Sequence, residues 1–300
     1  MLSFGIDIGG TMIKTAIVNE KGELDRKKLY PTGKGLEEQL LEIIDLELYE
    51  NRVEAIGIGT AGRVNPRTGS VSLATDNLAD WTGVRIKEII EEKTGITTSV
   101  INDANAAAFG EWFVNHRNAE SLAMLTVGTG LGGGVVIDGL PLLGKRGEAA
   151  EFGHQILYPG GRKCNCGKNG CAEQYVSMRL IHRLVAEVTG YEIERTELIK
   201  QFLGGDPIVH KAVQRVAKDL AVLIDSVFLN FDPDIVVVGG GISELGDSFL
   251  DLLREEISHY ERASLYTGYN VVLSGSGNDS GIVGAAIYAM NRVLKDYPTW

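Results

Sequence analysis

The fold is decided by the stretch Phe4-Gly5-Ile6-Asp7-Ile8-Gly9-Gly10-Thr11-Met12-Ile13-Lys14. It predicts a buried strand, a turn of glycines and threonine, and a returning strand. The same order recurs at residues 121–137, and each half later has an apolar strand that runs into glycines, at 57–62 and 239–241. We therefore expect a duplicated α/β protein with two lobes and an interdomain cleft, the kind of crevice in which ligands bind.

The two glycine turns predict a polyphosphate site. Turns at 9–11 and 128–134 present backbone N–H groups and a threonine hydroxyl to an anion. Either turn alone is equally typical of a structural hairpin, so the prediction depends on the pair. Asp7 directly precedes the first turn and predicts a Mg²⁺ ligand that acts through water. The alternative for Asp7 is an ion pair with Lys14.

Three glycine-rich segments match other nucleotide-binding motifs, but their context excludes those motifs. Residues 139–146 nearly match a P-loop, but Arg146 stands where Mg²⁺ needs a serine or threonine. Residues 57–62 and 128–133 match the dinucleotide fingerprint, yet neither leads into a helix. A dehydrogenase is therefore disfavoured.

The cysteines predict a metal site. All three lie within eight residues, at Cys164, Cys166 and Cys171. Three thiolates are one ligand short of a tetrahedral zinc shell, and His154 is the nearest imidazole. His182 is the second choice, and buried inert cysteines are the alternative to a metal site. An odd, clustered set suits metal binding in a reducing cytoplasm.

Acidic residues supply the candidates for chemistry. Glu151 and Glu173 bracket the cysteines and are expected to grip a polyol. Asp103 follows Asn102 where a strand ends and a helix begins, so it is either a helix N-cap or a catalyst. A phosphoryl transferase needs a carboxylate that takes the proton of the attacking hydroxyl. In that case Asn102 and Asn77 are expected to bond sugar hydroxyls.

Composition narrows the partners. The 300 residues carry a net charge of −11 and no long run of lysine or arginine, which argues against nucleic acid or an anionic membrane as partner. No apolar stretch approaches a membrane span, and the first residues contain no basic region of a signal peptide.

At these motifs the sequence resembles the ROK family of sugar kinases and related repressors. The resemblance rests on residues 4–14, Asn102-Asp103-Ala104-Asn105, Gly128–Gly134, Glu151-x-Gly153-His154 and the cysteine segment through Glu173. It implies an actin-like ATPase fold of two ribonuclease-H-like halves. We expect a smaller lobe at 1–116 and a larger lobe at 117–300, with the last helix, about 285–300, packing back on the first.

The resemblance also implies a reaction and its residues. The reaction is ATP-dependent phosphorylation of a hexose at its 6-hydroxyl, with glucose the first candidate and fructose, N-acetylmannosamine and N-acetylglucosamine the alternatives. Asp103 is the implied catalytic base. The implied sugar ligands are Gly62, Asn77, Asn102, Asp103, Glu151, His154 and Glu173, and the implied ligands of a structural zinc are His154, Cys164, Cys166 and Cys171. The implied ATP and Mg²⁺ residues are Asp7, Gly9, Gly10, Thr11, Lys14, Gly128, Thr129, Gly130, Gly132, Gly133, Gly239, Gly240 and Gly241, with residues 278–285 beside the adenosine.

Two other functions remain open from the sequence. The family's repressors carry an N-terminal helix-turn-helix segment, whereas here the first strand is expected at residue 3, which favours an enzyme over a sugar-sensing regulator. An actin-type assembly ATPase is the third possibility. A homodimer is an expectation from the family alone.

Overall fold

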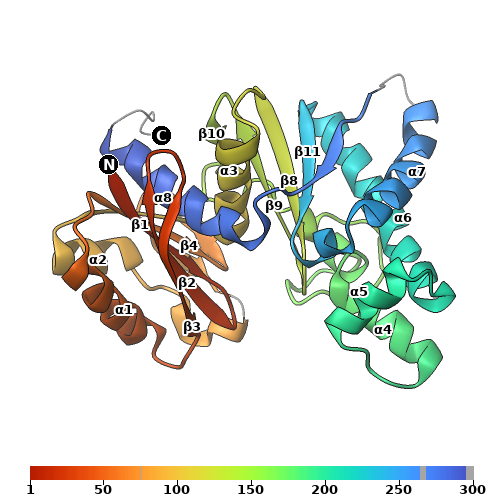
Figure 1. The fold of residues 1–300 in the computed structure, drawn as a ribbon, viewed down its shortest axis with the longest axis horizontal. Coiled ribbons are helices and arrows are strands. Elements are labelled where there is room, and N and C mark those ends of the chain that lie inside the picture. The colour runs from red at the N-terminus through yellow and green to blue at the C-terminus, as the bar shows by residue number, and fades with distance from the viewer. Residues whose placement is uncertain (75, 264–267, 295–300) are drawn as a thin grey trace. The chain divides into compact units, whose positions relative to one another are not determined.

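The structure is a computed structural model that describes residues 1–74, 76–263 and 268–294 (Figure 1). The chain forms two compact units. Unit 1 contains Met1–Asn118, Gly134–Ala150 and Asn278–Trp300, and unit 2 contains Ala119–Gly133 and Glu151–Gly277. The end of the predicted last helix, residues 295–300, lies outside the described residues.

Unit 1 is built on a five-stranded sheet in the order β3-β2-β1-β4-β7. Its strands are β1 (Leu2–Ile8), β2 (Met12–Asn19), β3 (Leu24–Pro31), β4 (Ala55–Thr60) and β7 (Thr97–Asn102). The first three strands pair antiparallel, as the strand–turn–strand prediction requires, and β4 and β7 join them in parallel. The helices of this unit are α1 (Leu36–Glu50), α2 (Ile86–Thr94), α3 (Asp103–Asn115) and α8 (Ser280–Val293). Its short elements are β5 (Arg63–Val64), β6 (Val71–Leu73), β10 (Leu140–Pro141) and the 3₁₀ segment Asp76–Trp81.

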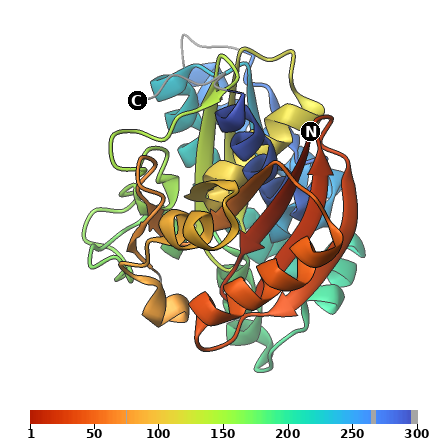
Figure 2. The same ribbon diagram turned by 90° about the vertical axis from the view of Figure 1, so that its left-hand side faces the viewer.

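The two faces of this sheet differ in side-chain size because successive strand residues point to opposite faces. Ile6 and Ile58 are fully buried in one apolar cluster with Leu40 of α1. The alternating positions Gly5 and Gly57 form the other face, where α8 lies (Figure 2). The sequence therefore assigns a packed core to one face and a close helix contact to the other.

Helix α8 approaches its neighbours at backbone distance. A Cβ atom on Gly57 would lie 2.0 Å from the carbonyl oxygen of Ala285, and one on Gly284 would lie 1.8 Å from that of Ala106 in α3. Nothing larger than glycine fits at either position without a backbone shift. The chain's last helix is thus an integral part of unit 1.

The second sheet repeats the strand order of the first. It runs β10-β9-β8-β11-β12, with β8 (Ser121–Val127), β9 (Leu131–Ile137), β11 (Ile235–Gly239) and β12 (Val271–Leu273). Strand β11 pairs in parallel with both β8 and β12. The repeat confirms the predicted duplication of an α/β half.

The helices of unit 2 are α4 (Met178–Thr189), α5 (Arg195–Leu203), α6 (Pro207–Phe231) and α7 (Asp247–Ala263). Helix α6 begins where the sequence predicts: the Asp206 side chain accepts hydrogen bonds from the backbone of Ile208 and Val209, at 2.9 and 3.0 Å. It ends at Asp232, whose φ of 42° is left-handed. Across the described part of the chain, no helix combines the length and apolarity needed to cross a membrane.

Candidate functional site

Asp103 is the first residue of α3, and Asn102 is its N-cap. The Asn102 Oδ1 atom accepts from the backbone N–H groups of Ala104 and Asn105, at 3.0 and 3.1 Å. The reading of Asp103 as the cap is therefore wrong. Asn102 has the extended backbone of a cap (φ −62°, ψ 145°), so the residue before Asp103 does the capping, and the catalytic role of Asp103 stays a prediction.

Asn102 also links Asp103 to the segment that follows β4. Its Nδ2 group donates to the Asp103 Oδ1 atom and to the backbone carbonyl of Gly62, each at 2.9 Å. Asp103 Oδ1 accepts a second bond, from the Ala104 backbone N–H at 2.9 Å. Three predicted sugar residues of unit 1 are thus joined in one network. The side chain of Asn77 lies outside the described part of the structure.

Asp7 and Lys14 form an ion pair beside the first glycine turn. The Lys14 Nζ atom donates to Asp7 Oδ2 at 3.0 Å, and the two side chains are only 26% and 14% exposed. The pairing alternative is therefore confirmed, while the Mg²⁺ role of Asp7 stays a prediction. Across the turn, the Thr32 hydroxyl and backbone N–H donate to the carbonyls of Gly9 and Thr11, at 2.8 and 3.0 Å. The end of β3 thus holds the turn in shape.

The second glycine turn lies against Glu173. A Cβ atom on Gly130 would lie 2.5 Å from Glu173 Oε2, so a larger residue there would displace this carboxylate. The Leu131 backbone N–H lies 3.4 Å from the same oxygen. The Gly128 carbonyl accepts from the backbone N–H of Met178 at 2.8 Å, which joins the turn to the start of α4.

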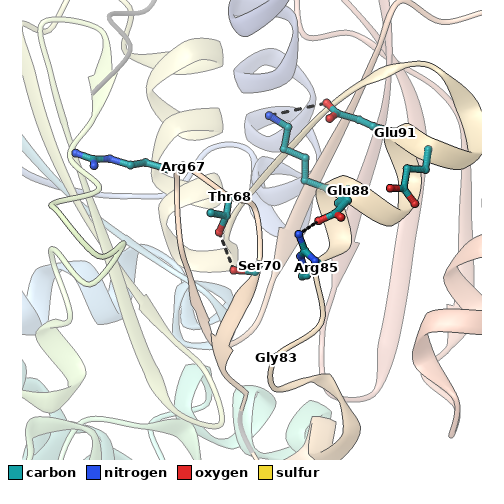
Figure 3. Close-up of a pocket in the computed structure, with 9 residues that line it drawn as sticks. Arg67, Thr68, Ser70, Gly83, Arg85, Glu88 and Glu91 are labelled. Atoms are coloured by element: carbon teal, nitrogen blue, oxygen red, sulfur yellow. Dashed lines mark hydrogen bonds and ion pairs between the residues drawn. The ribbon is translucent and has the colours of Figure 1, made fainter.

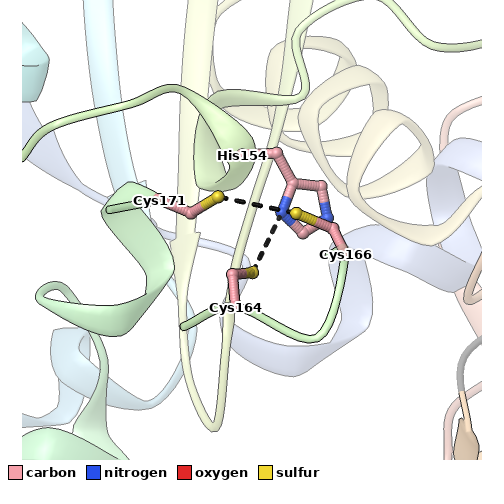
Figure 4. A group of neighbouring side chains, drawn as sticks. All are labelled: His154, Cys164, Cys166 and Cys171. Carbon is pink, nitrogen blue, oxygen red and sulfur yellow. Dashed lines mark hydrogen bonds between the residues drawn. The ribbon is translucent and has the colours of Figure 1, made fainter. Parts of the chain in front are cut away.

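Four side chains gather as the sequence predicts for a metal site (Figure 4). The ligand atoms of His154, Cys164, Cys166 and Cys171 all lie within 4.8 Å of one another. Cys164 Sγ is 3.8 Å from His154 Nδ1, and Cys166 Sγ is 3.5 Å from Cys171 Sγ. With Zn–S bonds of about 2.3 Å, the sulfurs of a tetrahedral shell lie about 3.8 Å apart. The cluster therefore fits a tetrahedral ion of zinc's size.

His182, the second choice for a metal ligand, is not in this group. Its Nδ1 atom lies 2.9 Å from the carbonyl oxygen of Ile193, and its helix α4 carries it elsewhere in unit 2. The alternative fourth ligand is therefore wrong.

The thiols of the cluster titrate differently. Burial raises the pKa of Cys171 to about 12, and its hydrogen bonds with Cys166 and Cys164 act in the same direction. Burial also raises the pKa of Cys166, but hydrogen bonds from the Lys168 backbone and the neighbouring thiols outweigh it, so this pKa lies below its ordinary value. Because a thiol binds zinc only as a thiolate, loading a metal here releases protons.

The four side chains of the predicted metal site lie on the same segment of the chain as Glu151 and Glu173, the other predicted sugar residues of unit 2. The His154 backbone N–H donates to the Glu151 carbonyl at 3.0 Å, and Glu173 stands two residues after Cys171. A bridge between Ile156 and Cys171 closes the segment on itself. An ion at the cluster would therefore fix the backbone that carries both glutamates.

Sequence reasoning missed the side chains that anchor this segment. The Tyr158 hydroxyl donates to Asp219 Oδ1 at 2.6 Å, and Arg215 donates to the same oxygen at 3.0 Å. Asp219 is 2% exposed and lies on α6. Tyr158 and Asp219 are 61 residues apart, so no local pattern announces the contact.

A separate cavity of about 490 Å³ lies on unit 1 (Figure 3). It is lined by Arg67, Thr68, Ser70, Gly83, Arg85, Lys87, Glu88, Glu91 and Glu92. Arg85 pairs with Glu88 at 2.5 Å and Lys87 with Glu91 at 3.9 Å. None of these lining residues is a predicted site residue.

Two sheets of identical strand order, each with a glycine–threonine turn after its first strand, define the actin-like ATPase fold that sugar kinases use. The chain belongs to the ROK family, whose sequence profile matches residues 3–292. The glucokinase of Thermotoga maritima is 34% identical over 315 residues, covering 96% of this chain and 97% of the relative.

Two solved structures are similar over nearly their whole length. The ROK hexokinase of Thermus thermophilus is 33% identical, with a TM-score of 0.85 over 98% of this chain and 100% of that one. A ROK family glucokinase from Streptomyces griseus, in complex with glucose and AMPPNP, is 32% identical, with a TM-score of 0.86 over 97% and 100%.

Proposed function

We propose that the protein is an ATP-dependent hexose kinase that phosphorylates glucose at its 6-hydroxyl. The observation that carries the proposal is the carboxylate of Asp103, which is held at the start of α3 while Asn102 does the capping. The glucokinase and hexokinase relatives, which match almost the whole chain, support the same reaction.

Asp103 is the general base of this proposal. Its carboxylate takes the proton of the sugar 6-hydroxyl as the hydroxyl oxygen attacks the γ-phosphorus of ATP in line, and ADP leaves. The bonds from Asn102 and the Ala104 backbone hold one carboxylate oxygen in place, so the base is oriented before the sugar binds. Gly62, Asn77, Asn102, Glu151, His154 and Glu173 contact the sugar in this proposal.

The nucleotide is assigned to the glycine segments. Residues 9–11 and 128–133 offer backbone N–H groups to the phosphates, and Lys14 adds a cation beside the first turn. Residues 239–241 border the adenosine. The Asp7 carboxylate suits Mg²⁺, which would offset negative charge on the phosphates. AMPPNP in the Streptomyces griseus glucokinase supports ATP as the donor.

We assign zinc to His154, Cys164, Cys166 and Cys171. Three sulfurs and one imidazole are a donor set typical of structural zinc, with no position left for a reacting water. Bound zinc would stiffen the segment that carries Glu151 and Glu173. A three-thiol site also fits a reducing compartment, and we place the reaction in the cytoplasm.

The test is an ADP-release assay coupled to NADH oxidation, run across a panel of hexoses. We expect ADP release with glucose and a much slower rate with fructose, N-acetylmannosamine and N-acetylglucosamine. A sensor would bind glucose without ADP release, and an assembly ATPase would hydrolyse ATP without sugar. Either result would refute the kinase assignment, and a faster rate with another hexose would change the substrate. Sedimentation of the active protein tests the homodimer.

A further inference from the structure

The Arg195 guanidinium covers Gly241 in unit 2. The Arg195 Nη2 atom donates to Glu244 Oε1 at 2.5 Å and to the Gly241 carbonyl at 3.4 Å. A Cβ atom on Gly241 would lie 2.9 Å from that nitrogen and 3.3 Å from Cζ. Glycine thus lets the guanidinium rest directly on the backbone.

This contact lies at the carboxyl ends of two parallel strands. Strand β11 ends at Gly239, and Gly240 packs on the backbone of Val127, the last residue of β8 (a Cβ there would lie 2.7 Å from the Val127 carbonyl). The same Cβ atom on Gly241 would lie 3.4 Å from Met178 Cγ, and the Met178 backbone N–H donates to the Gly128 carbonyl in the second glycine turn. In open α/β sheets, ligands bind outside this edge.

The chemistry of the Arg195–Glu244 pair favours a nucleobase over a phosphate group as its ligand. Glu244 balances the charge of Arg195, so the pair does not act as an unpaired cation for a triphosphate. Half of the Arg195 side chain remains in solvent, with 45% exposed. A guanidinium is planar and can lie flat against an aromatic face, whereas the compact ammonium of lysine has no plane to stack.

We propose that Arg195 sets the nucleotide preference of this chain: Glu244 and Gly241 hold its guanidinium so that the exposed face stacks on the purine of ATP. This inference rests on the proposed use of ATP and adds a residue that discriminates among nucleotides. A purine has more stacking area than a pyrimidine, so the contact favours ATP over CTP.

The test compares Arg195→Ala and Arg195→Lys with wild type. Loss of a cation–π contact is expected to raise the KM for ATP about 2- to 30-fold and to lower the preference for ATP over CTP by a similar factor. The lysine variant keeps the charge and part of the cation–π attraction but loses the stacking plane, so its KM for ATP is expected to lie between those of wild type and the alanine variant. Full rescue by lysine, or an unchanged ATP-to-CTP preference in Arg195→Ala, would overturn the proposal.

Lys200→Ala is the matched control. Lys200 lies on the same helix, pairs with Glu197 at 3.8 Å and is 80% exposed. It is expected to leave the KM for ATP unchanged. A control that raises this KM as much as Arg195→Ala does would attribute the effect to α5 as a whole and refute a specific role for Arg195.

Gly241→Ala supplies a second, independent route. Its Cβ atom would displace the guanidinium without removing it. The double variant with Arg195→Ala is expected to bind ATP no more weakly than Gly241→Ala alone, because the two changes remove one contact. Fully additive losses would contradict the coupling.

Calorimetric titration with ATP in the absence of sugar keeps this test separate from the kinase assignment. Weaker ATP binding by Arg195→Ala, in a protein that phosphorylates no hexose, would support Arg195 and refute the reaction. Unchanged ATP binding in an active kinase would refute only the role of Arg195.

Discussion

Replacing Asp103 with asparagine separates two tasks that an acidic residue at a helix start can perform. The amide keeps an oxygen for the bonds from Asn102 and the Ala104 backbone but cannot take a proton. Because Asn102 is the cap, we expect Asp103→Asn to lose only the favourable charge in the first turn, less than about 1 kcal/mol of stability. Loss of the base lowers kcat by about 10²–10⁴, or about 3–5 kcal/mol of barrier.

Asn102→Ala is the matching variant that is expected to reduce stability, whereas Asp103→Asn is expected to reduce activity. It removes a helix cap, worth about 1 kcal/mol, and two bonds from Nδ2, worth about 0.5–1.5 kcal/mol each. We therefore expect a loss of about 2–4 kcal/mol in the free energy of unfolding, several times that of Asp103→Asn.

Urea unfolding and the coupled kinase assay together measure both quantities. The expected pattern is a stable, nearly inactive Asp103→Asn and a destabilised Asn102→Ala. If Asp103→Asn kept more than about a tenth of the wild-type kcat, the base assignment would be refuted, since a lost general base costs more. If Asp103→Asn were the less stable of the two variants, the assignment of the cap would be wrong.

Three further predictions concern the metal, the packing and pH. Cys166→Ser should lower bound zinc from about one ion per chain and raise the KM for glucose; full zinc content in the purified variant would contradict the ligand assignment. Gly284→Ala should destabilise the protein by about 1–3 kcal/mol or more, because the new Cβ would meet the Ala106 carbonyl at 1.8 Å; an unchanged thermal midpoint would refute the close approach. Burial and the neighbouring Glu47 carboxylate raise the pKa of Tyr30 from 10.0 to about 12. The protonated Tyr30 hydroxyl therefore contributes its full share to the free energy of unfolding below pH 10, and this contribution is lost as pH rises toward 12. Tyr30→Phe should therefore lose less stability than wild type across that window in urea titrations, and parallel curves would exclude the linkage.

The regular elements were predictable because local chemistry specifies them. Asp206 and Pro207 predict where helix α6 begins, and a continuous apolar stripe predicts its course. The group of metal-binding side chains was predictable because three cysteines in eight residues limit the choice of ligands. His154, and not His182, is the imidazole that lies beside them. In each case the determining residues are close together in sequence.

The remaining features depend on contacts between distant residues. Asn102 and Asp103 are equally good caps by residue type, and only the backbone angles of Asn102 and the hydrogen bonds that its side chain accepts decide between them. Arg195 lies 46 residues before Gly241, and Tyr158 lies 61 residues before Asp219. The local sequence around one residue of each pair does not predict its partner, so these contacts are known only from the structure.

The packing of α8 against Gly57 has a consequence for the synthesis of the protein. Residues 1–118 leave the ribosome early, but the helix that fills one face of their sheet comes from residues 280–293. At bacterial and eukaryotic translation rates, the intervening chain takes on the order of 10–30 s to make. During that interval the part of this face at Gly5 and Gly57 lacks the helix that covers it in the folded protein, so nascent chains are expected to need protection there until translation reaches α8.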